Sequence, residues 1–572
     1  MAFCHPIFAS ANKPPIMYSP NKSSDSKSRL IIASKQNIHI FNNGNGNGKE
    51  SIELRHAKIL EEVKLLLASK ERKNTYEGLS MVDSIQRLGI GYHFEEEIEA
   101  ILKSKHLMLG HQGNGYEELS EVALQFRILR QEGYFISADI FGKFLDDKGK
   151  LKHTLFEDID GLIALFEASH LSIEGEHSLD EAGEFCRKYL HGWMSTFHDH
   201  LLVKVVNQTL QYPIHKSLSR FMPTCLQLEN AGWTSSLHEL SEIDTQMISY
   251  LHLKEISSVS KWWKELGLAN DLKFARNEPI KWYMWPMACL PDPRFSEERT
   301  ELTKPLSLIY IIDDIFDFHG NIEELSLFTD AVKRWDLAAV EQLPDCMKVC
   351  FKVLYDITNE FAFKTQVKHG WNPIVTLTKS WLRLFNAFLQ EAKWFASGHV
   401  PEAEEYLKNG IVSTGVHVIL VHAFFFRGQG LTEENVTLME EFPSIVSTTA
   451  TILRLCDDLE GDKDVKCDGN DGSYLRCYMK EHPGVSDEQA REHINQRISD
   501  AWKQLNRECM TPNSLPSSFT KLCLNAARMV PVMYSYDGNS PSKLEEYVKS
   551  LIYRSSSMQK SVRSDSDYSF MK

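Results

Sequence analysis

The sequence predicts an almost entirely α-helical protein. From about Ile52 onward, apolar residues recur at intervals of three and four, which is the spacing of one buried helix face. Three such sets are Leu60, Val63, Leu66 and Leu67; Met81, Ile85 and Leu88; and Phe94, Ile98 and Leu102. Short polar segments rich in Gly, Asn and Asp separate them, as at 110–115 and 146–149. Alternating apolar and polar residues, the pattern of a half-buried strand, are almost absent.

The chain is long enough for more than one domain. Its 572 residues fit two domains or one large helical assembly. Gly232 and three serines interrupt the apolar spacing around Asn230 to Ser241, which predicts a linker there. We therefore divide the chain into a leader at 1–50, an N-terminal helical domain at 51–240 and a C-terminal domain at 241–572.

The leader differs in composition from the rest of the chain. It is rich in Ser, contains only Asp25 as an acid before Glu50, and ends in an Asn/Gly run at 42–48. Its basic residues include Lys13, Lys22, Lys27, Arg29 and Lys35. A basic, Ser-rich segment that is poor in acids is typical of an organelle transit peptide. The alternative is a disordered tail.

Charge, cysteine content and hydropathy exclude several partners. The formal net charge of -15 argues against nucleic acid or an anionic membrane as a general partner. The 11 cysteines form no CxxC pair, which favours reduced thiols over a disulfide framework. No continuous apolar run approaches the roughly 18 residues of a membrane helix. The nearest run, Val416 to Phe426, contains His417 and His422 and predicts a buried helix.

A short acidic segment follows the apolar stretch 306–312. It contains Asp313, Asp314 and Asp317, and helical geometry puts Asp313 and Asp317 one turn apart on the same face. Carboxylates that converge in this way repel each other unless a cation joins them, and they bind Mg²⁺ together with substrate phosphates. The alternative is a solvated helix end.

A second acidic segment follows another apolar stretch, 445–455. Its acids are Asp457, Asp458, Glu460, Asp462 and Asp464. Two core helices that end in acids predict opposite walls of one cavity that holds divalent metals. Arg276 and Arg454 are candidates to bind a phosphate group, and the many aromatic residues between the two segments could line an apolar pocket whose π faces stabilise a carbocation.

Several motifs together resemble the plant class I terpene synthases over nearly the whole chain after the leader. Asp313 to Asp317, DDIFD, matches the DDxxD motif of that family, and the segment at Asp457 occupies the place of its second metal motif, (N/D)DxxSxxxE. Further similar segments are IQRLGIGYHF at 85–94, LRQEGY at 129–134, EASH at 167–170, and NAAR at 525–528 followed by Tyr534 and Asp537.

The resemblance implies a fold and an activity. The fold is all-α, with a vestigial α-barrel-like N-terminal domain and a C-terminal class I α-bundle that carries the chemistry. Three Mg²⁺ or Mn²⁺ ions would bind a prenyl diphosphate, which is ionised to an allylic cation and diphosphate. The leader then predicts the plastid stroma, with the cytosol as the alternative, and the enzyme is expected to be a monomer without a membrane span.

The resemblance also implies roles for individual residues. Asp313, Asp317 and Asp457 would be metal ligands, and Asp314 would support them. Arg276 and Arg454 match arginines that contact the diphosphate. Three aromatic or acidic positions complete the set, Trp285 in the pocket and Tyr534 and Asp537 in the segment that caps it.

Two departures from the family pattern predict an acyclic product. The RxR motif is replaced by Arg276-Asn277-Glu278, and no paired arginines followed by Trp occur near the start of the mature chain. Both absences resemble the subfamily that makes linalool, nerolidol, myrcene and ocimene. We therefore expect linalool from geranyl diphosphate, with nerolidol from farnesyl diphosphate or an acyclic olefin as alternatives.

A third departure concerns the second metal motif. Gly461 and Val465 stand where the family has Ser/Thr and Glu, so only Asp457 remains of the three ligands. On a helix, Glu460 and Asp464 lie about 60° and about 20° from the direction of Asp457. We expect Asp464, together with Glu460, to replace the lost ligand. The rival interpretation is a catalytically weakened paralogue.

Other classes fit the sequence less well. A class II cyclase needs a DxDD motif, and the nearest string, Asp158-Ile159-Asp160-Gly161, lacks the last aspartate. A prenyl transferase generally has a second aspartate-rich motif and no long N-terminal helical domain. A non-catalytic binding protein with the same fold would not need the acids and arginines of both segments. No Ser/His/Asp set, Gly-rich phosphate loop or zinc spacing competes.

Overall fold

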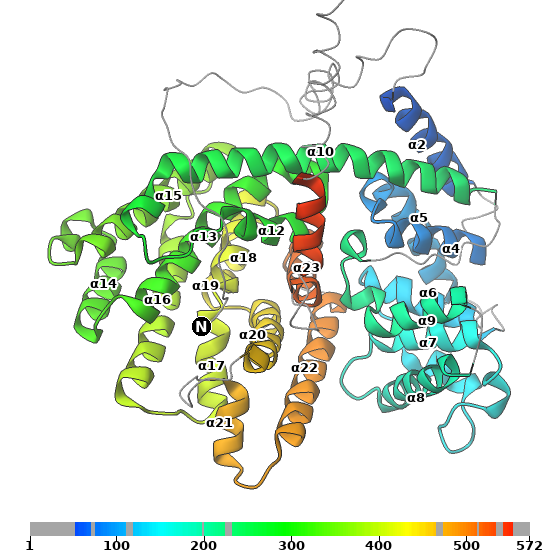
Figure 1. The fold of residues 1–572 in the computed structure, drawn as a ribbon. Helices are drawn as coiled ribbons and strands as arrows, with labels where there is room; N and C mark the ends of the chain where they lie inside the picture. Colours follow the sequence, from blue (N-terminus) through cyan, green and yellow to red (C-terminus); the bar gives the residue numbers. More distant parts are fainter. Residues whose placement is uncertain are drawn as a thin grey trace, which may run out of the picture.

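The described part of the chain is helical throughout. The computed structural model describes residues 52–69, 75–109, 118–196, 200–222, 232–464, 473–511, 514–533 and 542–552. Within these ranges helices are joined by turns (Figure 1), and the one strand-like pairing is an isolated bridge between Leu145 and Leu151. This bridge closes the turn predicted at 146–149, where Asp146 Oδ1 accepts the backbone N–H groups of Lys148 and Lys150. The all-α prediction is confirmed.

The first group of helices packs around its own hydrophobic core. These helices are α2 (Ile52–Ala68), α4 (Tyr76–Arg87), α5 (Glu95–Leu109), α6 (Leu119–Gln131), α7 (Ile159–Ser169), α8 (His177–Met194) and α9 (His200–Gln211). The predicted apolar faces supply much of this core, because Val63, Met81, Ile85, Phe94 and Ile98 are all buried in it. They form the part of the molecule coloured from blue through cyan to blue-green (Figure 1).

One long helix, α10 (Thr234–Leu266), runs across both halves of the molecule (Figure 1). Leu237, Leu240 and Ile243 pack into the N-terminal core, whereas Ile256 and Val259 pack into the C-terminal one. The linker predicted around Asn230 to Ser241 is therefore wrong from Thr234 onward, because these leucines keep the helical spacing despite the intervening serines. The predicted boundary at 240/241 falls within α10 and stays a prediction.

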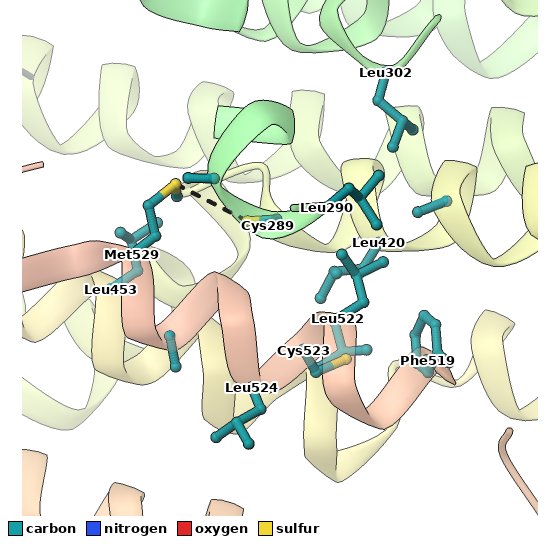
Figure 2. Close-up of a cluster of buried hydrophobic side chains, with 14 of the residues drawn as sticks. Cys289, Leu290, Leu302, Leu420, Leu453, Phe519, Leu522, Cys523, Leu524 and Met529 are labelled. Carbon is teal, nitrogen blue, oxygen red and sulfur yellow. Dashed lines mark hydrogen bonds between the residues drawn. The ribbon is translucent and has the colours of Figure 1, made fainter. Parts of the chain in front are cut away.

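The remaining helices build the C-terminal half. They are α11 (Leu268–Asp271), α12 (Pro279–Cys289), α13 (Ser296–Phe318), α14 (Ile322–Arg334), α15 (Asp345–His369), α16 (Ile374–Ser397), α17 (Ala403–Ser413), α18 (Val416–Arg427), α19 (Glu433–Glu440), α20 (Ser444–Asp464), α21 (Tyr474–Glu481), α22 (Asp487–Met510) and α23 (Ser517–Met533). Side chains from α12, α18, α20 and α23 meet in one large core. Figure 2 shows part of it, where Cys289 of α12 lies 3.9 Å from Met529 of α23, from Sγ to Sδ.

Hydrogen bonds from side chains of α22 and α23 hold the two halves together. Asn506 of α22 donates from Nδ2 to the carbonyls of His170 (3.0 Å) and Ser172 (2.9 Å). Its Oδ1 lies 2.7 Å from His215 Nε2, and Arg528 of α23 donates from Nε to the His215 carbonyl at 2.6 Å. Because these polar groups are buried and satisfied across the interface, the N-terminal half fixes the positions of α22 and α23.

One apolar stretch is longer than the run expected from the sequence. Among the described residues, Ala403–Arg427 is long and apolar enough by composition to cross a membrane, but 72% of its most apolar window is buried inside the protein. The stretch consists of α17 and α18, which are separated at Gly415 with φ +69°. The predicted buried helix at Val416 to Phe426 is confirmed as α18.

The described cysteines agree with the expectation of reduced thiols. Eight cysteines lie in the described ranges, and all are free. Cys350 of α15 is buried, and Cys346 lies one turn before it on the same helix and is half-buried.

Candidate active site

The first acidic wall lies at the C-terminal end of α13. Ile309, Ile311, Ile312 and Ile315 are buried, so packing fixes the last two turns of this helix. The Asp313 side chain lines a central cavity, and Asp317 follows one turn later with an exposed side chain. The protein around Asp317 still desolvates its carboxyl, and together with repulsion from Asp313 and Glu391 this raises the pKa of Asp317 to about 6.

Asp314 turns away from the cavity and binds Arg276. It is only 3% exposed, and its Oδ2 accepts the backbone N–H of Arg276 at 2.7 Å. Its Oδ1 forms an ion pair with Arg276 Nε at 2.8 Å. Adjacent residues of one motif thus have different positions: Asp313 faces the cavity, while Asp314 holds the turn before α12 against α13.

Arg276 bridges this wall. Its Nη2 donates to Asp313 Oδ2 at 2.5 Å and to the Tyr310 carbonyl at 3.1 Å. Burial would lower the pKa of the Arg276 guanidinium, but Asp313 and Asp314 raise that pKa above its usual range. Arg276 therefore stays charged at the mouth of the cavity, where it can bind an anion.

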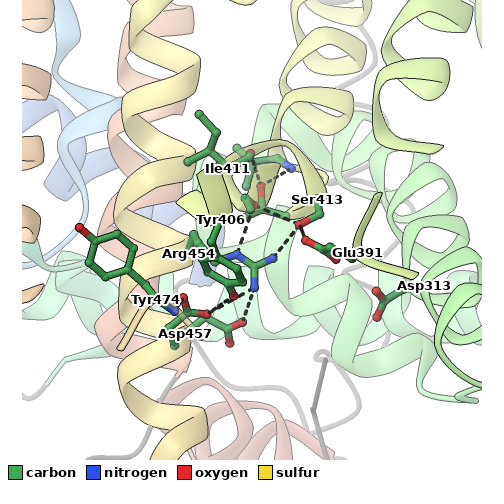
Figure 3. Close-up of polar contacts among 12 residues, drawn as sticks. Asp313, Glu391, Tyr406, Ile411, Ser413, Arg454, Asp457 and Tyr474 are labelled. Carbon is green, nitrogen blue, oxygen red and sulfur yellow. Dashed lines mark hydrogen bonds and ion pairs between the residues drawn. The ribbon is translucent and has the colours of Figure 1, made fainter. Parts of the chain in front are cut away.

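The second wall is formed by α20, as predicted. Arg454 and Asp457 both line the central cavity, and their side chains lie 3.8 Å apart from Nη1 to Oδ2. Arg454 is fixed from behind, because Nε donates to the Gly410 carbonyl (3.2 Å) and Nη2 donates to Ser413 Oγ (3.0 Å). Figure 3 shows this arrangement around the guanidinium. Gly410 permits it, since a Cβ there would lie 3.1 Å from Arg454 Nε.

Asp458 plays the same supporting part on α20 that Asp314 plays on α13. It is buried, and it accepts hydrogen bonds from Tyr406 OH at 3.1 Å and from the Tyr474 backbone N–H at 3.0 Å. Burial raises the pKa of Asp458 to about 6, and Arg454 and the Tyr474 N–H oppose this rise. Asp458 thus anchors α21 and α17 to α20 behind Asp457.

The structure adds one acid that sequence analysis missed. Glu391 of α16 accepts hydrogen bonds at Oε1 from Ser413 Oγ (2.6 Å) and Asn409 Nδ2 (3.1 Å), and Ser413 in turn binds Arg454 (Figure 3). Because Ser413 lines the central cavity, Glu391 lies directly behind that lining, and its charge helps to raise the pKa of Asp317. In the sequence, Glu391 follows an apolar stretch, Leu384 to Phe388, as the other acids do. A single glutamate after such a stretch is equally typical of a solvent-exposed helix turn, so it did not predict a site residue.

The central cavity joins a polar mouth to an apolar interior. Arg276, Asp313, Arg454 and Asp457 occupy the polar part. Including its open mouth, the cavity contains about 1120 Å³ of empty space. The interior is lined mainly by apolar and aromatic side chains, among them Trp285, Leu302, Ile309, Tyr310, Phe388, Ile419, Leu420, Leu453 and Leu522. The predicted pocket position of Trp285 agrees with this lining.

Several predicted residues lie outside what the structure describes. Tyr534 and Asp537 fall outside the described residues, as does Val465. The α20 backbone is helical to Asp464, but the side chains of 460–464 are not described. The proposal that Glu460 and Asp464 replace the missing ligand therefore stays a prediction.

The oxygen donors present suit a hard divalent cation. Asp313 and Asp317 on one wall, Asp457 on the other and Glu391 beside them are all carboxylates, the ligand type that Mg²⁺ and Mn²⁺ prefer. A cation beside Asp317 would offset the repulsion from Asp313 and Glu391, which adds to desolvation in raising the pKa of Asp317.

Both halves of the chain match models of known protein families. Residues 264–504 match the model of the terpene synthase family, metal binding domain, and residues 29–210 match that of the terpene synthase, N-terminal domain. A crystal structure of isoprene synthase from grey poplar leaves, in complex with three Mg²⁺ ions and dimethylallyl-S-thiolodiphosphate, is 31% identical with a TM-score of 0.79, over 87% of this chain and 96% of that one.

Curated relatives match over most of their length. A chloroplastic neryl diphosphate diphosphatase of Glycine max is 52% identical, over 88% of this chain and 96% of the relative. An (E)-nerolidol synthase of Cannabis sativa is 46% identical (94% and 98%), and a chloroplastic S-(+)-linalool synthase of Arabidopsis thaliana is 45% identical (88% and 89%). A tricyclene synthase of Antirrhinum majus is 44% identical (85% and 85%).

These matches explain the geometry. Carboxylates from two helices, two arginines beside them and an apolar cavity beyond are the parts that metal-dependent ionisation of a prenyl diphosphate requires. The chain belongs to the plant class I terpene synthases, metal-dependent lyases that act on prenyl diphosphates.

Proposed function

We propose that this enzyme ionises geranyl diphosphate and releases an acyclic monoterpene, with linalool as the main product. The observation that carries the proposal is the division of the central cavity into a charged mouth and an apolar interior. The mouth suits a diphosphate, and the interior suits a hydrocarbon chain.

Arg276 and Arg454 would bind the diphosphate from the two walls. Each is already held in place, Arg276 by Asp314 behind the cavity and Arg454 by the Gly410 carbonyl and by Ser413 of the cavity lining, so little reorganisation is needed when the anion enters. Asp313, Asp317 and Asp457 would hold the divalent cations, which supply positive charge against the leaving diphosphate when bound. As negative charge develops on the departing group, the two guanidinium groups stabilise it.

The apolar interior would then protect the allylic cation. Trp285, Tyr310 and Phe388 present aromatic side chains to the cavity, and π faces attract a cation. The surrounding leucines and isoleucines exclude most water, so that the cation ends by proton loss or by reaction with one admitted water. Reaction with water gives an alcohol, and proton loss gives the acyclic olefins myrcene or ocimene.

The loop at Arg276 supports an acyclic outcome. The second arginine position of the RxR motif holds Glu278, which forms an ion pair with Lys281 at 3.5 Å. Asn277 accepts a hydrogen bond from Trp263 Nε1 at 2.7 Å and so is engaged outside the cavity. A single arginine on this loop gives less help to the recapture and isomerisation of diphosphate that cyclisation from geranyl diphosphate requires.

A second candidate substrate is neryl diphosphate, the cis isomer. The observation that favours it is the 52% identity to a protein named for neryl diphosphate hydrolysis. The mechanism would keep the same charged mouth, and water capture would again give an acyclic C10 alcohol. Farnesyl diphosphate, with nerolidol as the product, is supported by the Cannabis sativa relative.

A competition experiment distinguishes these substrates. The chain without residues 1–50 is incubated with equal concentrations of geranyl, neryl and farnesyl diphosphate, and consumption of each gives the ratio of the kcat/KM values. We expect geranyl diphosphate to be consumed fastest. If the neryl isomer is consumed faster, neryl diphosphate is the preferred substrate and the proposal for geranyl diphosphate is wrong. If farnesyl diphosphate is consumed faster, the preferred substrate has 15 carbons and the C10 proposal is wrong.

We also propose the plastid stroma as the location and a monomer as the active form. The plastid location is supported by the composition of residues 1–50 and by the chloroplastic names of two relatives. Fusion of residues 1–50 to a fluorescent protein should direct it to plastids, and a cytosolic signal would contradict this. Light scattering after size exclusion should give the mass of one chain.

A further inference from the structure

A second cavity lies between the two halves of the molecule. Helix α20 lines it with Ile452, Cys456 and Leu459, and helix α23 lines it with Ala527 and Val530. Residues of the N-terminal half, Lys216 among them, form the other side. Measured in the same way as the central cavity, it contains about 1290 Å³ of empty space, so it is of comparable size. We call it the interdomain cavity.

The charge of the interdomain cavity is one-sided. Its described lining residues include Lys216 and Arg491 and no carboxylate. Arg491 has a partner on its own helix, Asp487, at 2.7 Å. For Lys216, the described residues provide no ion pair; its Nζ lies 5.3 Å from the centre of the Trp502 ring. Burial lowers the pKa of Lys216 to about 8; Lys503 adds to this effect, whereas Cys456 and Asp180 oppose it.

The rest of the lining is mostly apolar. Ile452, Leu459, Ile498 and Val530 surround the space next to Lys216 and Trp502. An apolar cavity whose lining holds an ammonium group without an ion-pair partner among the described residues, and no carboxylate, favours a ligand with an apolar chain and an anionic head. We propose that the interdomain cavity is a second, non-catalytic binding site for such an amphipathic anion, a prenyl phosphate or a fatty carboxylate, whose head pairs with Lys216.

The two cavities share their walls. On α20, Leu453 and Asp457 face the central cavity, while Ile452 and Cys456 face the interdomain cavity. On α23, Ala526 lines the first and Ala527 the second. Because helices in a close-packed interior shift as units, a ligand behind α20 acts on the helix that carries Asp457 and Arg454. Binding of a substrate-like or product-like lipid in the interdomain cavity would therefore change the activity of the central cavity.

Cys456 provides a readout that does not depend on turnover. Full-length protein is treated with iodoacetamide in the presence of a chelator, and alkylation of the Cys456 peptide is followed by mass spectrometry with and without geranyl monophosphate. At a concentration ten times its dissociation constant, the probe should slow alkylation of Cys456 about tenfold. Cys346 on α15, which is half-buried but does not line the interdomain cavity, serves as the control thiol and should be unaffected.

Matched variants assign the effect to the interdomain cavity. Lys216→Met keeps the apolar stem against Trp502 but should abolish protection, while Lys216→Arg should retain it. Asp313→Ala impairs the central cavity and should leave protection unchanged. Geraniol, which has the chain without the anion, should protect unmodified protein much less; this comparison needs no variant to fold.

Comparison of geranyl monophosphate with decanoate tests which anions the interdomain cavity binds. Protection by geranyl monophosphate and equally by decanoate assigns the site to apolar anions in general, and selective protection by the former assigns it to prenyl phosphates. Absence of protection by both, protection that survives Lys216→Met, or protection that is lost in Asp313→Ala overturns it. None of these results depends on whether geranyl diphosphate is the preferred substrate, so the proposed function can fail separately.

Discussion

At the scale of single residues, neighbouring acids in one motif have different roles: one faces the cavity and the next is buried and supports it. Asp313 faces the cavity, whereas Asp314 is 3% exposed and binds Arg276 through both its oxygens. The same division recurs on α20, where Asp457 lines the cavity and Asp458 is buried against Tyr406. In each pair the first acid is available to substrate or metal, and the second fixes the backbone that presents it.

This division predicts different effects of matched substitutions on α13. Asp313→Asn should lower kcat/KM by about 10²–10³-fold, because it removes charge at the reacting end of the cavity. Asp314→Asn should instead cost about 1–3 kcal/mol of unfolding free energy, because it weakens the buried contacts to Arg276. Steady-state kinetics and urea unfolding of both variants test this. Equal kinetic losses with unchanged stability would contradict it.

The degenerate second metal motif gives another residue-scale prediction. Asp464 lies about 20° from the direction of Asp457 on a helix, whereas Asp462 lies about 140° away. If Asp464 is the substitute ligand, Asp464→Ala should raise the Mg²⁺ concentration for half-maximal activity roughly tenfold, as loss of one carboxylate ligand or its support does. Asp462→Ala removes the same charge from the same segment and should have little effect. Identical metal titrations for the two variants would show that Asp464 is not a ligand.

At the scale of helices, the break between α17 and α18 shapes the cavity. Ser413, Thr414 and Gly415 line the cavity where the chain passes from one helix to the next. Gly415 adopts φ +69°, and a Cβ there would lie 2.8 Å from Ile309 Cγ2 of α13. Only glycine allows this turn and this close approach together, so the break brings Ser413 to Glu391 and Arg454.

Gly415→Ala should therefore be much more harmful than a substitution at a comparable glycine. Gly398 also has a left-handed backbone, φ +65°, but nothing lies within 4 Å of its added Cβ. Gly398→Ala should cost about 1 kcal/mol from backbone strain alone. Gly415→Ala should cost a further 1–3 kcal/mol or so from overpacking against Ile309, and should lower kcat. Thermal unfolding and kinetics of the pair measure this difference, and equal stabilities would refute the packing argument.

At the scale of the whole molecule, buried neutral histidines make stability depend on pH. Burial lowers the pKa of His417 to about 3 and that of His422 to about 4, and both residues lie in the core on α18. The unfolded chain therefore binds protons that the folded chain does not, once the pH falls below about 6.5. Each such histidine should remove about 1.4 kcal/mol of stability per pH unit from there down to its folded pKa.

We expect the urea midpoint to fall between pH 7 and pH 5. His422→Phe places a neutral ring between Phe361 and Trp381, whose rings lie 4.8 Å and 5.9 Å from that of His422. The variant should show a shallower decline than unmodified protein, because one proton-binding site is lost from the unfolded state. An unchanged slope would mean that His422 is not neutral in the fold.

The sequence predicted the general plan for a physical reason. Helical spacing identified the N-terminal core, and acids placed directly after buried stretches identified both walls of the cavity, because a packed helix fixes the direction of its last turn. Glu391 could not be singled out, since its meaning depends on Ser413 and Arg454, which come from other helices. The linker failed because spacing by leucines outweighs serines in a long helix such as α10.

The most direct test of the account is the product profile of the chain without residues 1–50, given geranyl diphosphate and Mg²⁺ or Mn²⁺ and analysed by chiral gas chromatography with mass detection. The account predicts acyclic C10 products, chiefly linalool, that disappear when a chelator is added. Mainly cyclic products would contradict the inference from Glu278 and the missing arginines. No turnover with either metal would show that Gly461 and Val465 have disabled the second metal site.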